Sequence, residues 1–405
     1  MSQMRILFSV AEQHPTHRAD VAVLFGKYLP QLGIETDILT IHDPALATPP
    51  SWPGGRALTV PGSTGRLGKH ARKIVCDLRM LWLARKGYNA IQVRDKAFAA
   101  LVGLLAARLY GIKFYYWMSF PMAEAWVIFA RDRGRSVGVL RWLVAWVRGR
   151  VMGFILYRIV LPRADHVFVQ SKRMKNEVEG RGVASEKVTP VPMGVDPDCF
   201  DTEPSSDSTR EAVRPQFVYL GTLNRLRCPD LLIDAISLII KEEPKAKLLL
   251  VGDAEEEADR NWLRLIIAEK GLADSVQITG WIPANDALRA ARNCMAGLSP
   301  IPRGELFDCA SPTKAVEYLA LGLPVIANDQ PDQAEVLASV GVDCAELTPA
   351  AFAKAMLAVL KDPAPFRAQA FVGRNWVLRN RGYNVIAADV AAVYHGSKYA
   401  RVGGS

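Results

Sequence analysis

The sequence predicts an α/β protein of two Rossmann-like, doubly wound domains that face a cleft. The chain of 405 residues exceeds what one hydrophobic core usually organises. Apolar strand-like runs alternate with helix-like segments in two consecutive series, as in parallel sheets covered on both faces. Half of the residues are hydrophobic and 22% are charged, which is a globular composition. No Gly-x-Gly-x-x-Gly follows the first strand-like run, so a dinucleotide-binding oxidoreductase lacks its main support.

The first series of elements starts at the apolar run 5–10. Gly33 stands where a helix C-cap belongs, after a segment with helical spacing. The expected strands are 5–10, 35–40, 90–93, 113–117, 165–171 and 188–192, and the expected helices are 21–32, 69–86, 96–110 and 172–180.

The second series follows a stretch rich in Ser, Asp, Glu and Pro at residues 201–214, which we interpret as the interdomain linker. Its expected strands are 217–220, 247–251, 276–280, 296–300 and 323–327, and its expected helices are 229–241, 257–270, 284–291 and 311–322. We therefore expect a first domain of residues 1–200 and a second of residues 201–375, with helices of about 376–405 crossing back to the first.

Charge is distributed unevenly within the net +9. Residues 1–200 hold 28 Lys and Arg against 15 Asp and Glu, whereas residues 201–405 hold 22 against 26. This asymmetry predicts different partners for the two domains. No recognition motif accompanies the basic charge, so we expect no nucleic-acid partner.

Several features predict a cytoplasmic protein. The six cysteines are scattered without a Cys-x-x-Cys pair, as reduced thiols are. The first ten residues lack the apolar run and cleavage site of a signal peptide. No stretch reaches the roughly 18 to 20 uncharged apolar residues that a membrane span needs.

The segment 309–327 carries the strongest chemical signal. Ser311 is a favoured helix N-cap residue and Pro312 suits the first helical position, so free N–H groups there would suit a diphosphate. Glu317 lies one turn after Thr313 and could accept hydrogen bonds from ribose hydroxyls. The plainer alternative is an ordinary capped helix with a solvent-facing Glu.

Three further features belong together: Val251-Gly-Asp253, Pro192-Met-Gly-Val-Asp-Pro-Asp-Cys-Phe200, and Ser311-Pro-Thr-Lys…Glu-Tyr-Leu-Ala…Gly-Leu-Pro-Val-Ile-Ala327. Together these motifs resemble those of the retaining glycosyltransferases of family 4, which have the GT-B fold. The likeness covers residues 165–337 well and residues 5–120 in outline. It implies a hexosyltransferase that uses a UDP- or GDP-sugar with retention, without metal or cofactor. The first domain would bind the acceptor and the second the nucleotide-sugar.

The resemblance also implies the donor-site residues. The family binds its donor with a Glu-x7-Glu pair; Glu317 matches the second Glu, on the ribose, and Cys309 replaces the first, with Asp308 or Glu305 as candidate substitutes. The family's basic pair falls at Thr222 and Arg227, so Arg225 is expected to replace the lost charge. We expect Arg225, Arg227 and Glu317 to be catalytic, with donor contacts from Gly221, Thr222, Asp253, Cys309, Ala310, Ser311, Pro312, Thr313 and Lys314.

The acceptor-side candidates are fewer. His14 and His17 follow the first strand, where relatives have a Gly-rich loop. Ser119 or Glu124 would take over part of the role of a His that many relatives carry after the strand ending at Trp117. Two His without a nearby Cys or carboxylate pair are a poor zinc set, so we expect no metal.

Residues 131–163 predict contact with an anionic membrane surface. They contain eight Arg and a single acidic residue, Asp132, interleaved with Trp and aliphatic residues, a composition that suits the membrane interface. We expect peripheral binding at the inner leaflet of the cytoplasmic membrane and a lipid-linked glycan acceptor in surface polysaccharide biosynthesis. The expected contacts are Arg141, Trp142, Trp146, Arg148 and Arg150. In the alternative, these helices pack their apolar faces on the N-terminal sheet and the Arg are merely solvated.

Two further alternatives remain open. A sugar-nucleotide epimerase shares the GT-B architecture, although no acid–base pair flanking a sugar ring is evident. A non-catalytic GT-B partner subunit would agree with the loss of the first Glu at Cys309.

Overall fold

The computed structural model describes residues 3–16, 18–46, 48–134, 138–200 and 215–396. Two compact units form: unit 1 runs to Pro192 and resumes at Tyr383, and unit 2 is Met193–Gly382. Unit 2 therefore begins before the expected domain boundary at residue 200, because Val195 and Phe200 are buried in a hydrophobic cluster of unit 2. The expected linker at 201–214 lies outside the described residues.

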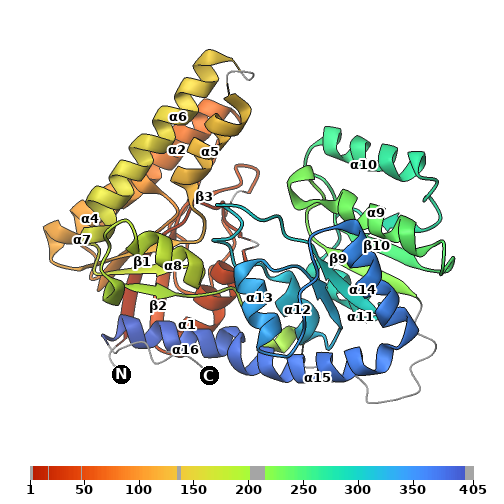
Figure 1. The fold of residues 1–405 in the computed structure, drawn as a ribbon. Helices are drawn as coiled ribbons and strands as arrows, with labels where there is room; N and C mark the ends of the chain where they lie inside the picture. Colours follow the sequence, from red (N-terminus) through yellow and green to blue (C-terminus); the bar gives the residue numbers. More distant parts are fainter. Residues whose placement is uncertain (1–2, 17, 47, 135–137, 201–214, 397–405) are drawn as a thin grey trace. The chain divides into compact units, whose positions relative to one another are not determined.

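Unit 1 is built on a parallel six-stranded sheet (Figure 1). Its strand order is β2-β1-β5-β6-β7-β8, so the direction of winding reverses between β1 and β5. The strands are β1 (Met4–Ser9), β2 (Ile34–Leu39), β5 (Ala90–Arg94), β6 (Lys113–Met118), β7 (His166–Val169) and β8 (Val188–Pro190), with a small separate pair, β3 (Ile41–His42) and β4 (Val60–Pro61).

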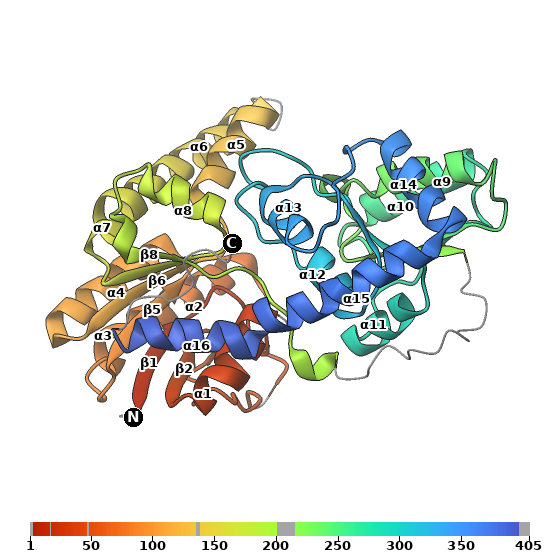
Figure 2. The same cartoon turned by 60° about the horizontal axis from the view of Figure 1, so that its bottom comes forward.

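Helices cover the unit 1 sheet. The C-terminal helix α16 (Tyr383–Tyr394) lies across it (Figure 2), with the Tyr394 ring 5.1 Å from that of Tyr115 and 5.3 Å from that of Phe168. Gly103 lets α4 (Ala97–Tyr110) approach β5 and β6, because a Cβ there would lie 2.9 Å from the Phe114 ring. The remaining helices are the π-helices η1 (Asp20–Tyr28) and η3 (Ile155–Val160), the 3-10 turn η4 (Ser185–Lys187), and α1 (Leu29–Gln31), α2 (Arg66–Leu78), α3 (Met80–Leu83), α5 (Met122–Arg133), α6 (Val139–Phe154), α7 (Leu161–Arg163) and α8 (Lys172–Glu179).

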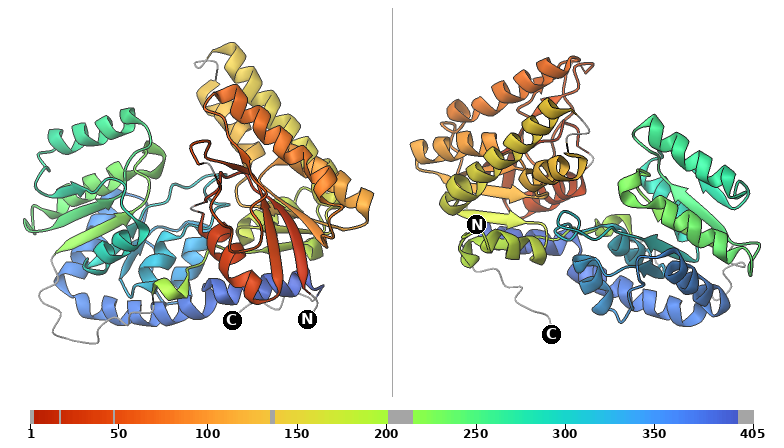
Figure 3. Two further views of the ribbon diagram at one scale, coloured as in Figure 1. Left: turned by 180° about the vertical axis from the view of Figure 1, so that it is seen from behind. Right: turned by 45° about the horizontal axis from the view of Figure 1, so that its top comes forward.

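The helices α5 and α6 pack together as a pair that stands out from the rest of unit 1 (Figures 1 and 3). Gly149 of α6 makes this close contact possible, because a Cβ there would lie 2.7 Å from Val127 and 2.8 Å from the Ala123 carbonyl oxygen. The helix α6 therefore packs on α5 through its small residues.

Unit 2 is a second parallel sheet, of five strands in the order β11-β10-β9-β12-β13. This is a Rossmann-like arrangement whose winding reverses between β9 and β12. Its strands are β9 (Gln216–Leu220), β10 (Lys247–Val251), β11 (Val276–Ile278), β12 (Ala296–Ser299) and β13 (Val325–Ala327). Its helices are η5 (Pro197–Cys199), η6 (Arg225–Arg227), α9 (Pro229–Ile239), α10 (Glu257–Glu269), α11 (Ala284–Arg292), α12 (Lys314–Ala320), α13 (Pro331–Ala338), α14 (Pro349–Lys361) and α15 (Pro363–Asn380).

The observed fold confirms the expected α/β class with two Rossmann-like domains. Each of the expected strands is present in one of the two large sheets. The expected helix at 311–322 is shorter and begins at Lys314.

Candidate active site

The carboxyl end of β9 is a crowded turn between two glycines. A Cβ on Gly252, which follows β10, would lie 2.1 Å from the carbonyl oxygen of Gly221, so only glycine fits there. Both residues have positive φ, 136° at Gly221 and 138° at Gly252, a region that other residues rarely adopt. In open parallel sheets ligands bind at the carboxyl ends of the strands where the winding reverses, and β9 lies at that point in unit 2.

Lys314 lies directly over this turn. Its Cε and Nζ would be 3.2 and 3.4 Å from a Cβ on Gly221, and its ammonium is 4.9 Å from the centre of the Tyr219 ring. Burial, and secondly the nearby positive charge of Arg227, lower the pKa of Lys314 to about 7, although Glu317 opposes this shift. The side chain can therefore lose or gain a proton near neutral pH.

Glu317 follows Lys314 by one turn of α12. Burial raises its pKa, while Lys314 and a hydrogen bond with the Thr313 side chain act in the opposite direction. Arg227 completes the group, with its guanidinium carbon 5.8 Å from the centre of the Phe307 ring. Two cations and one carboxylate thus lie near the end of β9, an arrangement that favours an added anion.

Arg225 takes a different direction from Arg227. Its Nε donates to Asp259 Oδ1 on α10 at 3.1 Å, and its guanidinium stacks 4.8 Å from the Trp262 ring centre. The side chain is 58% exposed. This differs from the expectation that both arginines serve the diphosphate, because α10 offers Arg225 an aromatic ring and a carboxylate. Lys314 supplies the second cation of the group instead.

Ser311 is not the helix N-cap that the sequence suggested. Its hydroxyl accepts a hydrogen bond from the Met193 N–H at 2.8 Å and donates to Asp332 Oδ2 at 2.7 Å. Asp332 is buried and also pairs with Arg381 at 2.8 Å. Because this network engages Ser311, the helix starts two residues later, with Thr313 at the N-cap position.

The loop before α12 is held by a buried amide that the sequence reading missed. Gln330 is fully buried and donates to the carbonyl oxygens of Phe307 and Ala310 at 2.8 and 2.9 Å. Gln330 stands between β13 and α13 as the N-cap of α13, and the Pro331 that follows it is the local sign of that position in the sequence. Pro312 is half-buried in the same segment.

The three positions considered for the donor sugar have different surroundings. Cys309 is buried, with 5% exposure. Asp308 is engaged by Arg303, which donates to both of its carboxylate oxygens at 2.8 and 3.2 Å and also pairs with Asp329. Glu305 is exposed. Both carboxylate oxygens of Asp308 are therefore already hydrogen-bonded within its own loop.

Asp253 and Thr222 lie at the same sheet edge. Asp253 accepts from Arg260 Nε at 2.9 Å and from the Ala254 N–H at 2.8 Å, and these bonds outweigh its slight burial and lower its pKa. The carbonyl oxygen of Thr222 accepts from the Tyr219 hydroxyl at 3.4 Å. Asp253 also lines a cavity of about 500 Å³ between α10 and β11.

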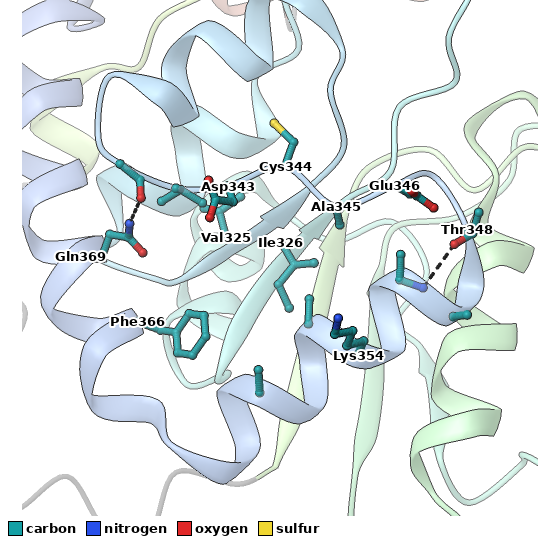
Figure 4. Close-up of a pocket in the computed structure, with 16 residues that line it drawn as sticks. Val325, Ile326, Asp343, Cys344, Ala345, Glu346, Thr348, Lys354, Phe366 and Gln369 are labelled. Carbon is teal, nitrogen blue, oxygen red and sulfur yellow. Dashed lines mark hydrogen bonds between the residues drawn. The ribbon is translucent and has the colours of Figure 1, made fainter.

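A larger cavity, of about 770 Å³, lies elsewhere in unit 2 (Figure 4). It is bounded by β13, the loop 341–348, α14 and α15, and Lys354, Glu346 and Gln369 are among its polar residues. None of the predicted donor residues lines it. Among the described residues, no three His, Cys, Asp or Glu side chains gather as the ligands of a metal would.

The acceptor-side candidates of unit 1 are dispersed. His14 is 3% exposed, its Nε2 is bonded to the Pro50 carbonyl oxygen at 2.9 Å, and its Nδ1 is buried without a hydrogen-bond partner among the described residues. Glu124 on α5 pairs with Arg181 at 2.9 Å. Ser119 is buried at the carboxyl end of β6, and His17 lies outside the described residues.

The surface of α6 is apolar and basic. Only Ala145 and Gly149 of this helix are fully buried, whereas its large apolar side chains are exposed, up to 74% at Leu140. Arg141, Arg148 and Arg150 are exposed with Trp146, and Trp142 is half-buried. Along the described part of the chain, no helix is long and apolar enough to cross a membrane.

Unit 2 has the Lys314 and Arg227 side chains near the switch point of its sheet, an arrangement that suits an anionic ligand. Comparison with known families matches residues 20–194 to a "Glycosyl transferase 4-like domain" and residues 214–362 to "Glycosyl transferases group 1". The chain belongs to the group 1 glycosyltransferases and has the GT-B fold.

Individual relatives agree with this family. The GDP-mannose-dependent alpha-(1-6)-phosphatidylinositol monomannoside mannosyltransferase of Mycobacterium tuberculosis is 25% identical over 97% of this chain and 98% of its own. Mannosylfructose-phosphate synthase of Agrobacterium fabrum is 32% identical, but over 33% of this chain and only 32% of its own length.

Solved structures share the fold. Anabaena HepE in complex with UDP has a TM-score of 0.71 at 16% identity, covering 97% of this chain and all of its own. A UDP-N-acetylglucosamine 2-epimerase from Listeria monocytogenes, described as putative, has a TM-score of 0.56 at 12% identity over 98% of this chain and 96% of its own. The fold therefore does not by itself separate transfer from epimerisation.

Proposed function

We propose that this glycosyltransferase takes a sugar from a UDP- or GDP-sugar held by unit 2. The observation that carries the proposal is Lys314 beside Gly221 at the switch point of the sheet, with Arg227 near enough for its charge to lower the pKa of Lys314. A nucleoside diphosphate is the anion that such a pair suits. Relatives by sequence and fold include a GDP-mannose-dependent enzyme and a UDP complex.

The two cations stabilise the departing diphosphate. Negative charge develops on the leaving group as the bond to the sugar breaks, and prearranged cations lower the free energy of that state without reorganising. Glu317, one turn along α12, accepts hydrogen bonds from the ribose hydroxyls. The reaction proceeds with retention at the anomeric carbon and requires no metal.

The acceptor in this proposal is a lipid-linked glycan of surface polysaccharide assembly, bound by unit 1 at the inner leaflet of the cytoplasmic membrane. The exposed apolar and basic residues of α6 support peripheral binding, because they are not used in packing on the sheet. Phe98, Leu105 and Leu109 of α4 are large apolar residues of unit 1 that are likewise exposed.

Glu317 offers a direct test. Loss of a hydrogen bond to a charged group costs about 1.5 to 3 kcal/mol, so Glu317→Ala should weaken binding of UDP or GDP at least tenfold in calorimetry. Glu346→Ala, in the larger cavity, is the matched control and should bind as the wild type does. Unchanged affinity in folded Glu317→Ala would remove the donor-site assignment.

A further inference from the structure

Three consecutive charged residues stand at the carboxyl end of β5 in unit 1: Arg94 is the last residue of the strand, and Asp95 and Lys96 follow it. Arg94, Asp95 and Lys96 stand between the apolar strand and the apolar helix α4. The winding of the sheet reverses between β1 and β5, so this edge is where a parallel sheet binds ligands. Of the residues that are hydrogen-bonded to these three charged side chains, only Ser119 was among the expected acceptor-side candidates.

Arg94 joins the loops that follow β1 and β6. Its side chain is wholly buried, and Nη2 donates to Asp20 Oδ2 and to Ser119 Oγ, each at 2.8 Å. Nη1 donates to Glu12 Oε1. One guanidinium thus holds both ends of the β1–η1 loop and the residue after β6, a task for which its planar fork of donors is suited.

Asp95 and Lys96 fix the same loops from either side. Asp95 adopts a left-handed φ of 54° and accepts hydrogen bonds from the Ser119 N–H at 2.7 Å and from the Ser119 hydroxyl. Lys96 donates to Ser9 Oγ at 2.9 Å and to the Val10 carbonyl oxygen at 3.3 Å. Left-handed backbone at a non-glycine residue is costly and is concentrated at functional sites.

Glu12 is the member of the group that combines an unpartnered polar atom with exposure to solvent. Asp20 Oδ1 and Arg94 Nε also lack a hydrogen-bond partner among the described residues, but their side chains are only 4% and 0% exposed. Its Oε1 is bonded to Arg94, whereas its Oε2 is buried without a hydrogen-bond partner among the described residues. The side chain as a whole is 25% exposed, so it borders solvent. Buried carboxylate oxygens are normally satisfied, and a hydroxyl group is the donor that a sugar or polyol acceptor brings.

We propose that Glu12 binds a hydroxyl group of the acceptor, and that Arg94, Asp95 and Lys96 are the positioning residues that hold it and its loop. This rests on the proposed function, since it locates the acceptor of that same transfer. Ser119 belongs to the support and does not touch the acceptor. Arg94 acts through Glu12 and Ser119, which explains a buried guanidinium at the edge of the sheet.

The test compares Glu12→Gln and Ser119→Ala with the control Asp37→Asn. Asp37, on β2, is also a buried carboxylate of unit 1. It pairs with Arg5 and Arg56 and lies away from the group around Arg94. Thermal unfolding shows that each variant is folded. The transfer assay uses UDP-glucose or GDP-mannose, whichever the wild type consumes, with a total membrane lipid extract as acceptor.

Glu12→Gln should raise the half-saturating amount of lipid extract at least tenfold, with Asp37→Asn unchanged. UDP or GDP affinity and the slow hydrolysis of donor without acceptor should stay at wild-type values. The effects of Glu12→Gln and Ser119→Ala should be non-additive, because both residues bond Arg94.

Equal acceptor saturation in wild type and Glu12→Gln would overturn the inference while leaving the proposed function intact. Equal loss in Asp37→Asn would also overturn it, since the effect would then be one of stability. A wild type that binds neither UDP nor GDP would overturn the proposed function and this inference with it.

Discussion

The chemistry of Lys314 depends strongly on its surroundings. An ordinary lysine is charged throughout the neutral range, whereas burial and the neighbouring Arg227 lower the pKa of Lys314 to about 7. A bound diphosphate would favour the charged form of this side chain and so reverse the shift.

Nucleotide affinity should therefore fall as the pH rises above about 7. Below this pH the ammonium is already charged; above it, binding must first take up a proton, so the affinity of UDP or GDP should drop by up to about tenfold per pH unit. Calorimetry from pH 6.5 to 9 measures this. Lys314→Arg keeps its charge and should show a flatter profile. A wild-type profile as flat as that of Lys314→Arg would contradict the assignment.

The two arginines of η6 should differ in catalysis. Arg227→Ala should lower turnover by about two orders of magnitude, in line with the loss of one prearranged stabiliser of the leaving group. Arg225→Ala should stay within about threefold of wild type, because this side chain forms an exposed pair with Asp259. Steady-state kinetics of the two matched variants measures this difference in turnover. A larger loss in Arg225→Ala would show that Arg225 leaves Asp259 in the complex.

Part of this site was expected from the family resemblance. The resemblance named Glu317, Lys314, Arg227 and Gly221, and the structure places Lys314 beside Gly221, with Arg227 and Glu317 near enough to act on its pKa. The engagement of Arg225 by α10 and of Ser311 by Asp332 depends on partners 34 and 21 residues away, which no local pattern reveals. The group around Arg94 was missed although its three charges follow a strand directly, because its partners come from distant loops.

At the scale of elements, α6 buries its small residues Ala145 and Gly149 and exposes most of its large apolar side chains. Contact with α5 through Ala145 and Gly149 leaves Trp146 and the large aliphatic side chains on the surface. The sequence pattern was compatible with helices packed on the sheet or on a membrane, since both bury apolar side chains. The exposure of these residues favours the second interpretation.

Reversal of two charges on α6 should weaken membrane binding. Each Arg near an anionic surface contributes about 1 kcal/mol, so Arg141→Glu with Arg150→Glu should reduce binding to anionic liposomes more than tenfold. The control is Arg289→Glu with Arg367→Glu, both exposed in unit 2. Flotation at low and high salt measures the effect, which should shrink as salt screens the charges. A wild type that fails to float at low salt would contradict membrane docking.

At the scale of the whole molecule, the alternation of strands and helices was enough to predict two Rossmann-like units. The large-sheet strands were predictable because buried parallel strands are continuous apolar runs. The two-residue strands β3 and β4 were not, since they carry no periodic signal. The start of unit 2 at Met193 was also missed, because Val195 and Phe200 join its hydrophobic cluster before the expected linker.

Catalysis of sugar transfer is the central claim, and fold alone does not distinguish it from epimerisation or mere binding. The most direct measurement incubates the protein with each of a panel of radiolabelled UDP- and GDP-sugars and a total membrane extract. We predict that label from one donor moves into solvent-extractable lipid in the wild type, and that Arg227→Ala slows this transfer by about two orders of magnitude. Label that stays on the nucleotide as an epimer, or donor that binds without turnover, would contradict the account.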